Sequence, residues 1–218
     1  MKSLPSKKLL SEYAPLRPLP KHNELLAHQA DDVFALWDAW EKESGGEREI
    51  PFWAAVWPGG VSLAHYLLHN SHIVSGKLVL DIGCGGGIAA IAASRAGAGK
   101  VIANDIDPVA LHIADLNATA NKATICTDQT NLLKEKNITA QFDVILVADM
   151  FYERSKAQPM LEFLKKYHKQ GASVLIADGE RNYAPKRGLK LIYEEIIQVN
   201  KDLEGVAERN VRLLSLIN

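Results

Sequence analysis

Residues 77–107 read KLVLDIGCGGGIAAIAASRAGAGKVIANDID and determine how we interpret the rest of the chain. The apolar run at 78–80 predicts a strand that is buried on both faces, and this strand ends at Asp81. A loop with four glycines follows: Gly83, Gly85, Gly86 and Gly87. Glycines let the backbone adopt positive φ and approach a ligand closely. We therefore expect a ligand-binding loop directly after this strand.

The second half of the same stretch completes a recognisable unit. Residues 88–96 are rich in alanine, which predicts a helix whose small side chains allow it to lie close to a sheet. Residues 100–104 predict a second strand, which ends at another acid, Asp105. A strand, a glycine loop, a helix, a second strand and a terminal acid form a nucleotide-type binding unit of a doubly wound α/β fold.

The spacing of the glycines distinguishes between kinds of nucleotide. A dinucleotide fingerprint that starts at Gly83 requires Gly or Ala at position 88, where the chain has Ile88. A P-loop requires Gly-Lys-Ser/Thr after the loop, and this sequence has no such tripeptide there. The pattern is instead Asp-x-Gly-x-Gly-x-Gly, with an acid before the glycines, and it resembles motif I of the class I S-adenosylmethionine (AdoMet) methyltransferases.

This resemblance implies AdoMet as the cofactor and gives roles to the residues of the loop. Gly83, Gly85 and Gly87 would form the backbone cradle of the cofactor. AdoMet has an ammonium group and a sulfonium group, so the carboxylate of Asp81 beside the loop is favourable. Asp105 follows the loop by about twenty residues, which is the interval at which an acid binds ribose hydroxyls. The simpler alternative is a glycine-rich turn with two solvated aspartates.

Composition limits the class of protein. The chain has 218 residues and a formal net charge of -1, which allows one large α/β domain and disfavours nucleic acid as a partner. It has two cysteines and no long apolar run, so we expect no membrane association and a cytoplasmic location, or the mitochondrial matrix if the source is eukaryotic. Four prolines within the first 20 residues disfavour the amphipathic helix of a mitochondrial presequence.

Residues 1–50 are predicted to be an N-terminal extension to a methyltransferase-like domain at 51–218. We expect residues 1–21 to form an extended arm and Asn23 to cap a helix over residues 24–42, which ends at Gly45. The apolar stripe of this helix consists of Val33, Leu36, Trp37 and Trp40. Such a stripe either belongs to the core or covers a pocket.

Residues 51–60 read PFWAAVWPGG, an aromatic segment that predicts neither a regular helix nor a strand. Trp57 is a candidate to stack on an adenine or lie against its edge, and the alternative is a hydrophobic plug between the N-terminal helix and the sheet. A helix is predicted over 61–70. Three histidines follow at helical spacing, at 65, 69 and 72, but no Cys or Glu is suitably placed in this segment, so we expect no metal site.

Further strands are predicted at 123–126, 142–148 and 173–177, and two β-rich runs follow at 189–199 and 206–217, with no helical pattern between them. A terminal hairpin after a parallel set gives a seven-stranded, mixed and mainly parallel, doubly wound sheet. Asp128 follows the third strand and is expected either to contact the adenine amino group or to form an ordinary turn. Asp149 ends the fourth strand and is therefore predicted to share one crevice with Asp81 and Asp105.

Three motifs narrow the resemblance: Trp57-Pro58-Gly59-Gly60, Ala103-Asn104-Asp105-Ile106-Asp107-Pro108 and Asp149-Met150-Phe151-Tyr152. They are similar to those of protein-lysine methyltransferases with an acid-x-x-Tyr/Phe motif after strand four, and most of all to the enzymes that modify the β-subunit of electron transfer flavoprotein. The resemblance implies a protein substrate, with Asp149 and Tyr152 as catalytic residues. The residues after strand five, Asp178-Gly179-Glu180-Arg181, differ from the expected Asp-Pro-Gly-Arg and leave the target protein open.

Other functions share this fold. A small-molecule amine N-methyltransferase would use the same cofactor loop behind a closing lid, and a methyltransferase acting on a ribosomal protein is a further alternative. An adenine- or glutamine-directed enzyme typically carries Asn/Asp-Pro-Pro-Tyr after strand four, and residues 149–152 have neither proline. A non-catalytic scaffold is disfavoured because the motifs at both the cofactor end and the acceptor end are intact.

Overall fold

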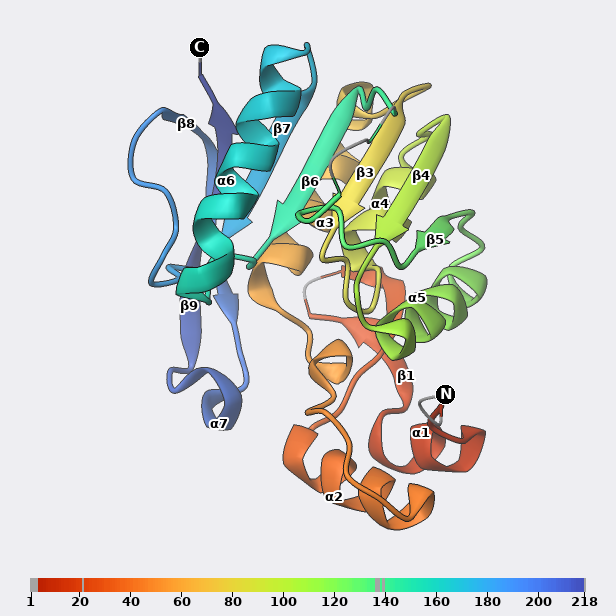
Figure 1. Cartoon of the computed structure of the whole chain (residues 1–218). Coiled ribbons are helices and arrows are strands. Elements are labelled where there is room, and N and C mark those ends of the chain that lie inside the picture. Colours follow the sequence, from red (N-terminus) through yellow and green to blue (C-terminus); the bar gives the residue numbers. More distant parts are fainter. Residues whose placement is uncertain (1–3, 21, 136–137, 139, 218) are drawn as a thin grey trace.

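The structure is a computed structural model that describes residues 4–20, 22–135, 138 and 140–217 (Figure 1). Its centre is a seven-stranded sheet in the order β5-β4-β3-β6-β7-β9-β8. The strands are β3 (Leu78–Ile82), β4 (Lys100–Asn104), β5 (Cys126–Asp128), β6 (Val144–Ala148), β7 (Ser173–Asp178), β8 (Leu189–Gln198) and β9 (Glu208–Leu216). Strands β3 to β7 are parallel, and β9 is antiparallel to both β7 and β8. The predicted fold class is therefore confirmed.

Helices cover both faces of the sheet. The helices are α3 (Pro58–His69), α4 (Ile88–Arg95), α5 (Pro108–Ala120) and α6 (Arg154–Lys169). Apolar side chains of α3 and α4 pack with those of β3, β4, β6 and β7 in one buried cluster, and α5 packs against α4 on the same side. Helix α6 covers the opposite face with a buried stripe of Met160, Phe163, Leu164 and Tyr167. The side chains of β3, β4, β6 and β7 point alternately into these two clusters, so both faces of these four strands are covered, whereas β5 at the edge of the sheet is largely exposed.

The N-terminal region differs from its prediction. It consists of α1 (Lys7–Tyr13), β1 (Leu16–Leu19), β2 (His22–His28) and α2 (Val33–Ser44). The expected extended arm contains helix α1, whose N-cap Ser6 accepts a hydrogen bond from Leu9 N. The expected helix from residue 24, capped by Asn23, is wrong in its first turns because this segment is strand β2, paired with β1. Helix α2 instead begins after Asp32, whose side chain accepts from two backbone N–H groups.

The apolar stripe of α2 belongs largely to the core. Val33, Leu36 and Trp40 are buried, and Trp40 meets Trp53 edge-to-face at 6.2 Å between ring centroids. Trp37 is only half-buried and donates its indole N–H to the carbonyl of Arg48 at 2.8 Å. The helix ends as predicted at Gly45, which has a φ of 69°.

Three smaller boundaries also differ from the sequence-based expectations. Helix α3 begins at Pro58, earlier than residue 61, because proline is favourable at the first helical position. Strand β5 spans Cys126–Asp128, whereas the strand was predicted at 123–126. A short helix, α7 (Lys201–Glu204), lies between β8 and β9, and its N-cap Asn200 accepts from Asp202 N and Leu203 N. Across the described part of the chain, no helix has the length and apolarity needed to cross a membrane.

Candidate active site

The glycine loop connects the end of β3 to the start of α4. Gly83 N and Cys84 N both donate to the carbonyl of Asn104, the last residue of β4, at 2.8 and 2.9 Å. Gly83, Gly85 and Gly87 all have positive φ, which confirms the predicted need for glycine in this loop. At Gly87 space is also short, since a Cβ there would lie 2.8 Å from the Cβ of Ala114 on α5. The loop is therefore fixed between β4 and α5.

Asn117 of α5 binds the backbone of the same loop and was not identified from the sequence. Its side chain is fully buried, donates to the carbonyl of Gly86 at 2.8 Å and accepts from His28 N of β2 at 2.8 Å. The pattern that marks it is a polar residue four positions after Ile113, in an otherwise apolar helix face. Through Asn117 the N-terminal hairpin is connected to the glycine loop.

Two carboxylates lie beside the loop, as predicted. Asp81 is buried and accepts one hydrogen bond, from Ala90 N at 3.0 Å. Burial raises the pKa of Asp81 to about 7, against the lowering effect of the Ala90 N–H, and the charge of Asp105 raises it further. Asp105 accepts from Gly85 N at 2.9 Å and Asp107 N at 3.0 Å, and burial raises its pKa as well. A cation beside these two carboxylates would stabilise their ionised forms, so carboxylates with raised pKa values favour a cationic ligand.

Asp128 lies at the end of the neighbouring strand, β5, opposite Asn104 of β4. Its carboxylate accepts from the N–H and the hydroxyl of Thr130 at 3.0 and 2.7 Å and from the side chain of Asn104 at 3.2 Å. These bonds form the turn that the sequence allowed as an alternative. The contact between Asp128 and an adenine amino group stays a prediction.

The aromatic segment divides between the core and the site. Trp53 is buried, and its carbonyl oxygen lies 3.1 Å from where a Cβ on Gly86 would be, so the residue beside the glycine loop is Trp53. Trp57 is half-buried, donates its indole N–H to the carbonyl of Phe52 at 3.0 Å and lies under the guanidinium of Arg181 at 5.3 Å. Its predicted role against an adenine remains untested.

Asp149 follows β6 and is held by three donors. Its Oδ2 accepts from Gly59 N at 2.5 Å, and its Oδ1 accepts from Gly179 N at 3.1 Å and from Arg181 Nε at 3.0 Å. The side chain is 6 % exposed and the residue has a φ of 53°, an unusual value for a residue other than glycine. Burial raises the pKa of Asp149, whereas the Arg181 charge and the two backbone donors lower it.

Arg181 connects Asp149 to the C-terminal hairpin. Its Nη1 and Nη2 atoms donate to both oxygens of Glu204 on α7, at 2.9 and 2.7 Å, and Arg209 Nε donates to the same carboxylate at 3.0 Å. The Arg181 guanidinium is 12 % exposed and both of its acidic partners are almost fully buried. The sequence marked Arg181 only as part of a motif that departs from expectation, and it gave no sign of this network.

Tyr152 and Asp178 complete this part of the site. Tyr152 is 52 % exposed and has Lys156 Nζ at 6.0 Å from its ring, so it lies at the surface beside Asp149 in the chain. Asp178 ends β7 and is buried, with Oδ2 accepting from Arg181 N at 3.1 Å. Its Oδ1 has no hydrogen-bond partner among the described residues, and burial raises its pKa to about 6. No separate role for Asp178 follows from the sequence.

The strand ends bring the predicted acids together at one edge of the sheet. Asp81, Asp105 and Asp149 belong to or follow β3, β4 and β6, which are neighbours in the order β4-β3-β6. Met150, next to Asp149, lies directly against the position that a Cβ on Gly83 would take. The acceptor-side loop after β6 therefore packs on the glycine loop, as the crevice of an open α/β sheet requires.

Comparison with known proteins gives a consistent result. The family model of ribosomal protein L11 methyltransferase (PrmA) matches residues 65–178. The chain is 41% identical over 144 residues to the electron transfer flavoprotein beta subunit lysine methyltransferase of Mus musculus, an overlap that covers 65% of this chain and 56% of that protein. The human protein of the same name is 38% identical over 147 residues, covering 65% and 54% of the two chains. The chain thus spans little more than half the length of these relatives.

A solved structure supports the fold. The magnesium protoporphyrin IX methyltransferase of Synechocystis, solved with bound AdoMet, superposes with a TM-score of 0.57 at 18% sequence identity. The superposition covers 84% of this chain and 91% of that one. The likeness supports the class I methyltransferase fold for this chain.

Proposed function

Because the chain belongs to the ribosomal protein L11 methyltransferase (PrmA) family, we propose that it transfers methyl groups from AdoMet to lysine side chains of a protein. One observation carries this proposal. Three carboxylates, the buried Asp81 and Asp149 and the half-buried Asp105, lie at the ends of three adjacent strands around a glycine loop. This arrangement offers negative charge both to a cationic cofactor and to the amine that accepts the methyl group.

The residues around the loop fit AdoMet. A Cβ on Gly85 would meet nothing within 4 Å, so the loop faces open space into which a ligand can approach the backbone. Asp81 has one hydrogen-bond donor and a raised pKa, and a neighbouring cation would favour its ionised form. Asp105 turns Oδ2 toward the loop at Gly85 N and Oδ1 toward Asp107 N, and we propose that its carboxylate binds ribose hydroxyls. When bound, AdoMet supplies an electrophilic methyl group on its sulfonium.

Asp149 is proposed to orient the acceptor. A carboxylate has about four lone-pair positions, and three of those of Asp149 are used by Gly59, Gly179 and Arg181. One position of Oδ2 therefore remains for an N–H of a lysine head. Orientation of this kind can supply a large share of a rate enhancement. Tyr152, exposed beside Asp149, would line the entrance with its ring toward the cationic head.

Arg181 supplies the charge that the acceptor needs beside Asp149. Methyl transfer requires a neutral nitrogen, and a free lysine with a pKa of about 10.4 loses its proton at pH 7 at a cost of about 4–5 kcal/mol. A carboxylate alone would raise the lysine pKa further. The guanidinium of Arg181, 3.0 Å from Asp149 Oδ1, offsets that effect, since a nearby positive charge disfavours the ammonium form.

The favoured substrate is the electron transfer flavoprotein β-subunit, since relatives with that name match 65% of the chain at about 40% identity. Ribosomal protein L11 is the second candidate, because the matching family model carries its name. The residues Asp178-Gly179-Glu180-Arg181, which depart from the expected Asp-Pro-Gly-Arg, lie beside Asp149, on the side where a protein substrate would enter.

The test is transfer of radiolabelled methyl from AdoMet to each purified protein and to a cell extract, followed by electrophoresis and mass spectrometry. We expect label on a lysine of the flavoprotein subunit. Label on L11 alone would favour the second candidate, and label confined to small molecules or nucleic acid would contradict protein-lysine transfer. An Asp149→Asn variant, run in parallel, shows whether the transfer depends on the proposed site.

A further inference from the structure

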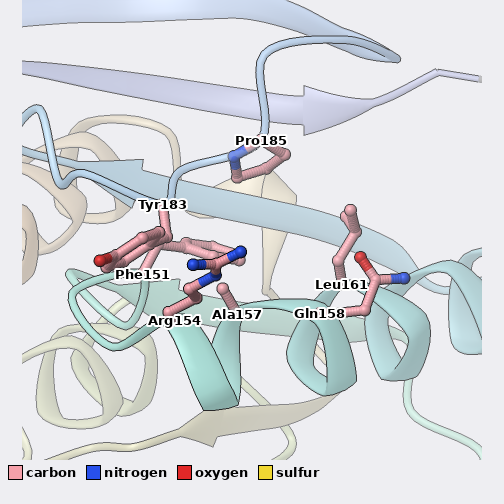
Figure 2. A pocket seen from close by; sticks show the side chains of 7 residues that line it. All are labelled: Phe151, Arg154, Ala157, Gln158, Leu161, Tyr183 and Pro185. Carbon is pink, nitrogen blue, oxygen red and sulfur yellow. The ribbon is translucent and has the colours of Figure 1, made fainter.

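A groove on the surface runs along α6, beside the loop that follows β7 (Figure 2). Its volume is about 350 Å³. It is lined by Phe151, Arg154, Ala157, Gln158, Leu161, Tyr183 and Pro185. The α6 residues form one wall, and Tyr183 and Pro185 form the other, as the close view shows. The groove is separate from the glycine loop and from the carboxylates described above, and the proposed chemistry does not use it.

The groove lies next to the proposed acceptor site in the chain, and a backbone hydrogen bond joins the loops that carry the two. Tyr183 N donates to the carbonyl of Phe151 at 3.1 Å, which joins the loop after β7 to the loop after β6. Phe151 is two residues after Asp149, and Tyr183 is two residues after Arg181. Two extended residues span at most about 7 Å, so the groove begins within that reach of the Asp149–Arg181 pair. A polypeptide bound in the groove can therefore continue to the site where a lysine would be modified.

The groove lies in the most basic part of the chain. Residues 154–190 contain nine lysines and arginines and three acids, whereas the whole chain has a net charge of -1. Arg154 lies at the start of the α6 wall and is exposed, and Lys186 and Arg187 are exposed directly after Pro185. Lys156 is different, because it pairs with Glu153 at 2.6 Å. An acidic ligand is therefore favoured at the open rim of the groove.

The lining inside the rim is mainly apolar. Leu161 and Pro185 are half-buried, Tyr183 is 42 % exposed, and Arg154 is the charged member of the lining. A nucleic acid backbone needs a row of cations along its path, whereas this lining contains a single charged residue, Arg154. A peptide with an apolar side chain between acidic residues matches both the apolar floor and the basic rim.

We propose that this groove binds an acidic segment of the protein substrate, with an apolar side chain of that segment against Leu161 and Tyr183 and its carboxylates beside Arg154, Lys186 and Arg187. The identification of the bound peptide as part of the methyl-transfer substrate rests on the proposed function. Peptide binding itself is measurable without any methyl transfer, so the two proposals can fail separately.

The test uses a fluorescein-labelled twelve-residue peptide of alternating Asp and Glu with a central Leu-Leu pair and no lysine, followed by fluorescence anisotropy. We expect binding that weakens as salt is added. Arg154→Glu should weaken it at least tenfold. This variant should fold, since an acid in the first turn of α6 is favourable to the helix dipole. Leu161→Asp tests the apolar floor and should weaken binding as well.

The matched control is Lys169→Glu, which makes the same change of charge at the other end of α6, about 22 Å along the helix axis. We expect it to leave peptide affinity within twofold of the parent. Equal losses in Arg154→Glu and Lys169→Glu would show unspecific attraction and overturn the proposal, as would tighter binding of a labelled oligonucleotide in a manner sensitive to Arg154. AdoMet affinity, measured on the same samples, reports on the cofactor site independently.

Discussion

Asp105 connects the ligand loop to the start of α5 through its hydrogen bonds to Gly85 N and Asp107 N. We predict that Asp105→Ala removes most of the affinity for AdoMet, because charge-assisted bonds in a partly buried site are lost. The expected loss is about 1.5–3 kcal/mol, or roughly 10- to 150-fold. Calorimetry measures the affinity, and circular dichroism shows whether the variant is folded. Unchanged binding by a folded variant would remove Asp105 from the cofactor site.

Asp81 makes the free energy of unfolding depend on pH, and the sign of this dependence follows from its pKa of about 7. In the folded chain Asp81 is protonated below that pH, whereas in the unfolded chain it ionises above about pH 4. Between these values the folded state binds more protons, so the free energy of unfolding falls as pH rises. Asp178, with a pKa raised to about 6, acts in the same direction, so only the difference from an Asp81 variant isolates Asp81.

AdoMet affinity should show the opposite trend, since a cationic ligand favours the ionised form of Asp81. We predict that affinity rises between about pH 5.5 and 7, by up to about tenfold per unit, and that binding releases a proton. Calorimetry in buffers of different ionisation enthalpy measures both quantities. Asp81→Asn should weaken binding near pH 7 and flatten the profile. A profile of equal slope in the parent and in Asp81→Asn would contradict this assignment.

Asp149 is the residue at which binding and catalysis can be separated. Asp149→Asn keeps the shape of the side chain but places an amide N–H against Gly59 N or Arg181, so its thermal midpoint should fall. AdoMet affinity should barely change. The single-turnover rate on a protein substrate should fall at least roughly a hundredfold, about 2.7 kcal/mol.

Both quantities must be measured on the same preparation of Asp149→Asn. A rate within threefold of the parent at unchanged affinity would rule out a catalytic role. Parallel losses of affinity and rate would indicate that Asp149 serves the cofactor or the local fold.

Among the elements, β2 is bound by side chains that lie far away in sequence. Asn117 of α5 and Asn121, the C-cap of α5, both bind the backbone of β2. Asn117 accepts from His28 N, and Asn121 binds the N–H and carbonyl of Leu26 at 2.8 and 2.6 Å. Asn117 alone also binds the glycine loop, at Gly86. Substitution of Asn117 or of Asn121 therefore distinguishes two effects: both weaken the attachment of the β1–β2 hairpin, but only loss of Asn117 removes the bond to the glycine loop.

We predict that Asn117→Ala lowers the free energy of unfolding by about 2–4 kcal/mol, since two buried backbone groups lose their partners. It should also lower AdoMet affinity severalfold, because Gly86 is released. Asn121→Ala is the matched control and should cost similar stability without a loss of affinity. Chemical denaturation and calorimetry provide the two measurements. Equal losses of affinity in both variants would mean that the hairpin as a whole, and not Asn117, supports the loop.

The sequence predicted the central sheet because each buried strand carries a local pattern that its neighbours share. Residues 24–30 read ELLAHQA, a composition that favours a helix, and tertiary hydrogen bonds from Asn117 and Asn121 override that propensity. The glycine loop and the strand-end acids were found because motif and topology agree. Asn117 was not found because a polar residue in an apolar helix face does not by itself indicate its distant partners, His28 and Gly86. The bond from Arg181 to Glu204 was not found because it joins separate elements that share no local pattern.

In the molecule as a whole, the N-terminal elements are part of the core. Leu9 and Leu10 of α1 and Leu36 and Trp40 of α2 pack in one cluster with residues of the aromatic segment and of α5. In Figure 1 these elements lie below the strand ends, on the side of α5. This packing bears on the proposed division at residue 50, because an independent domain at 51–218 would have to leave this face of α5 exposed.

The last prediction therefore concerns removal of residues 1–50. The shortened chain would expose Trp53, Val109 and Ile113, and it would leave Asn117 without its partner on β2. We expect it to lose cooperative unfolding and to aggregate, because an apolar face of this kind is not stable in water. A milder variant of the full chain, Trp40→Ala, should fold but lose about 3–5 kcal/mol of stability. Thermal unfolding and size-exclusion chromatography measure both. A monomeric shortened chain that melts cooperatively and binds AdoMet as the full chain does would instead establish 51–218 as an independent domain, with residues 1–50 as an accessory to it.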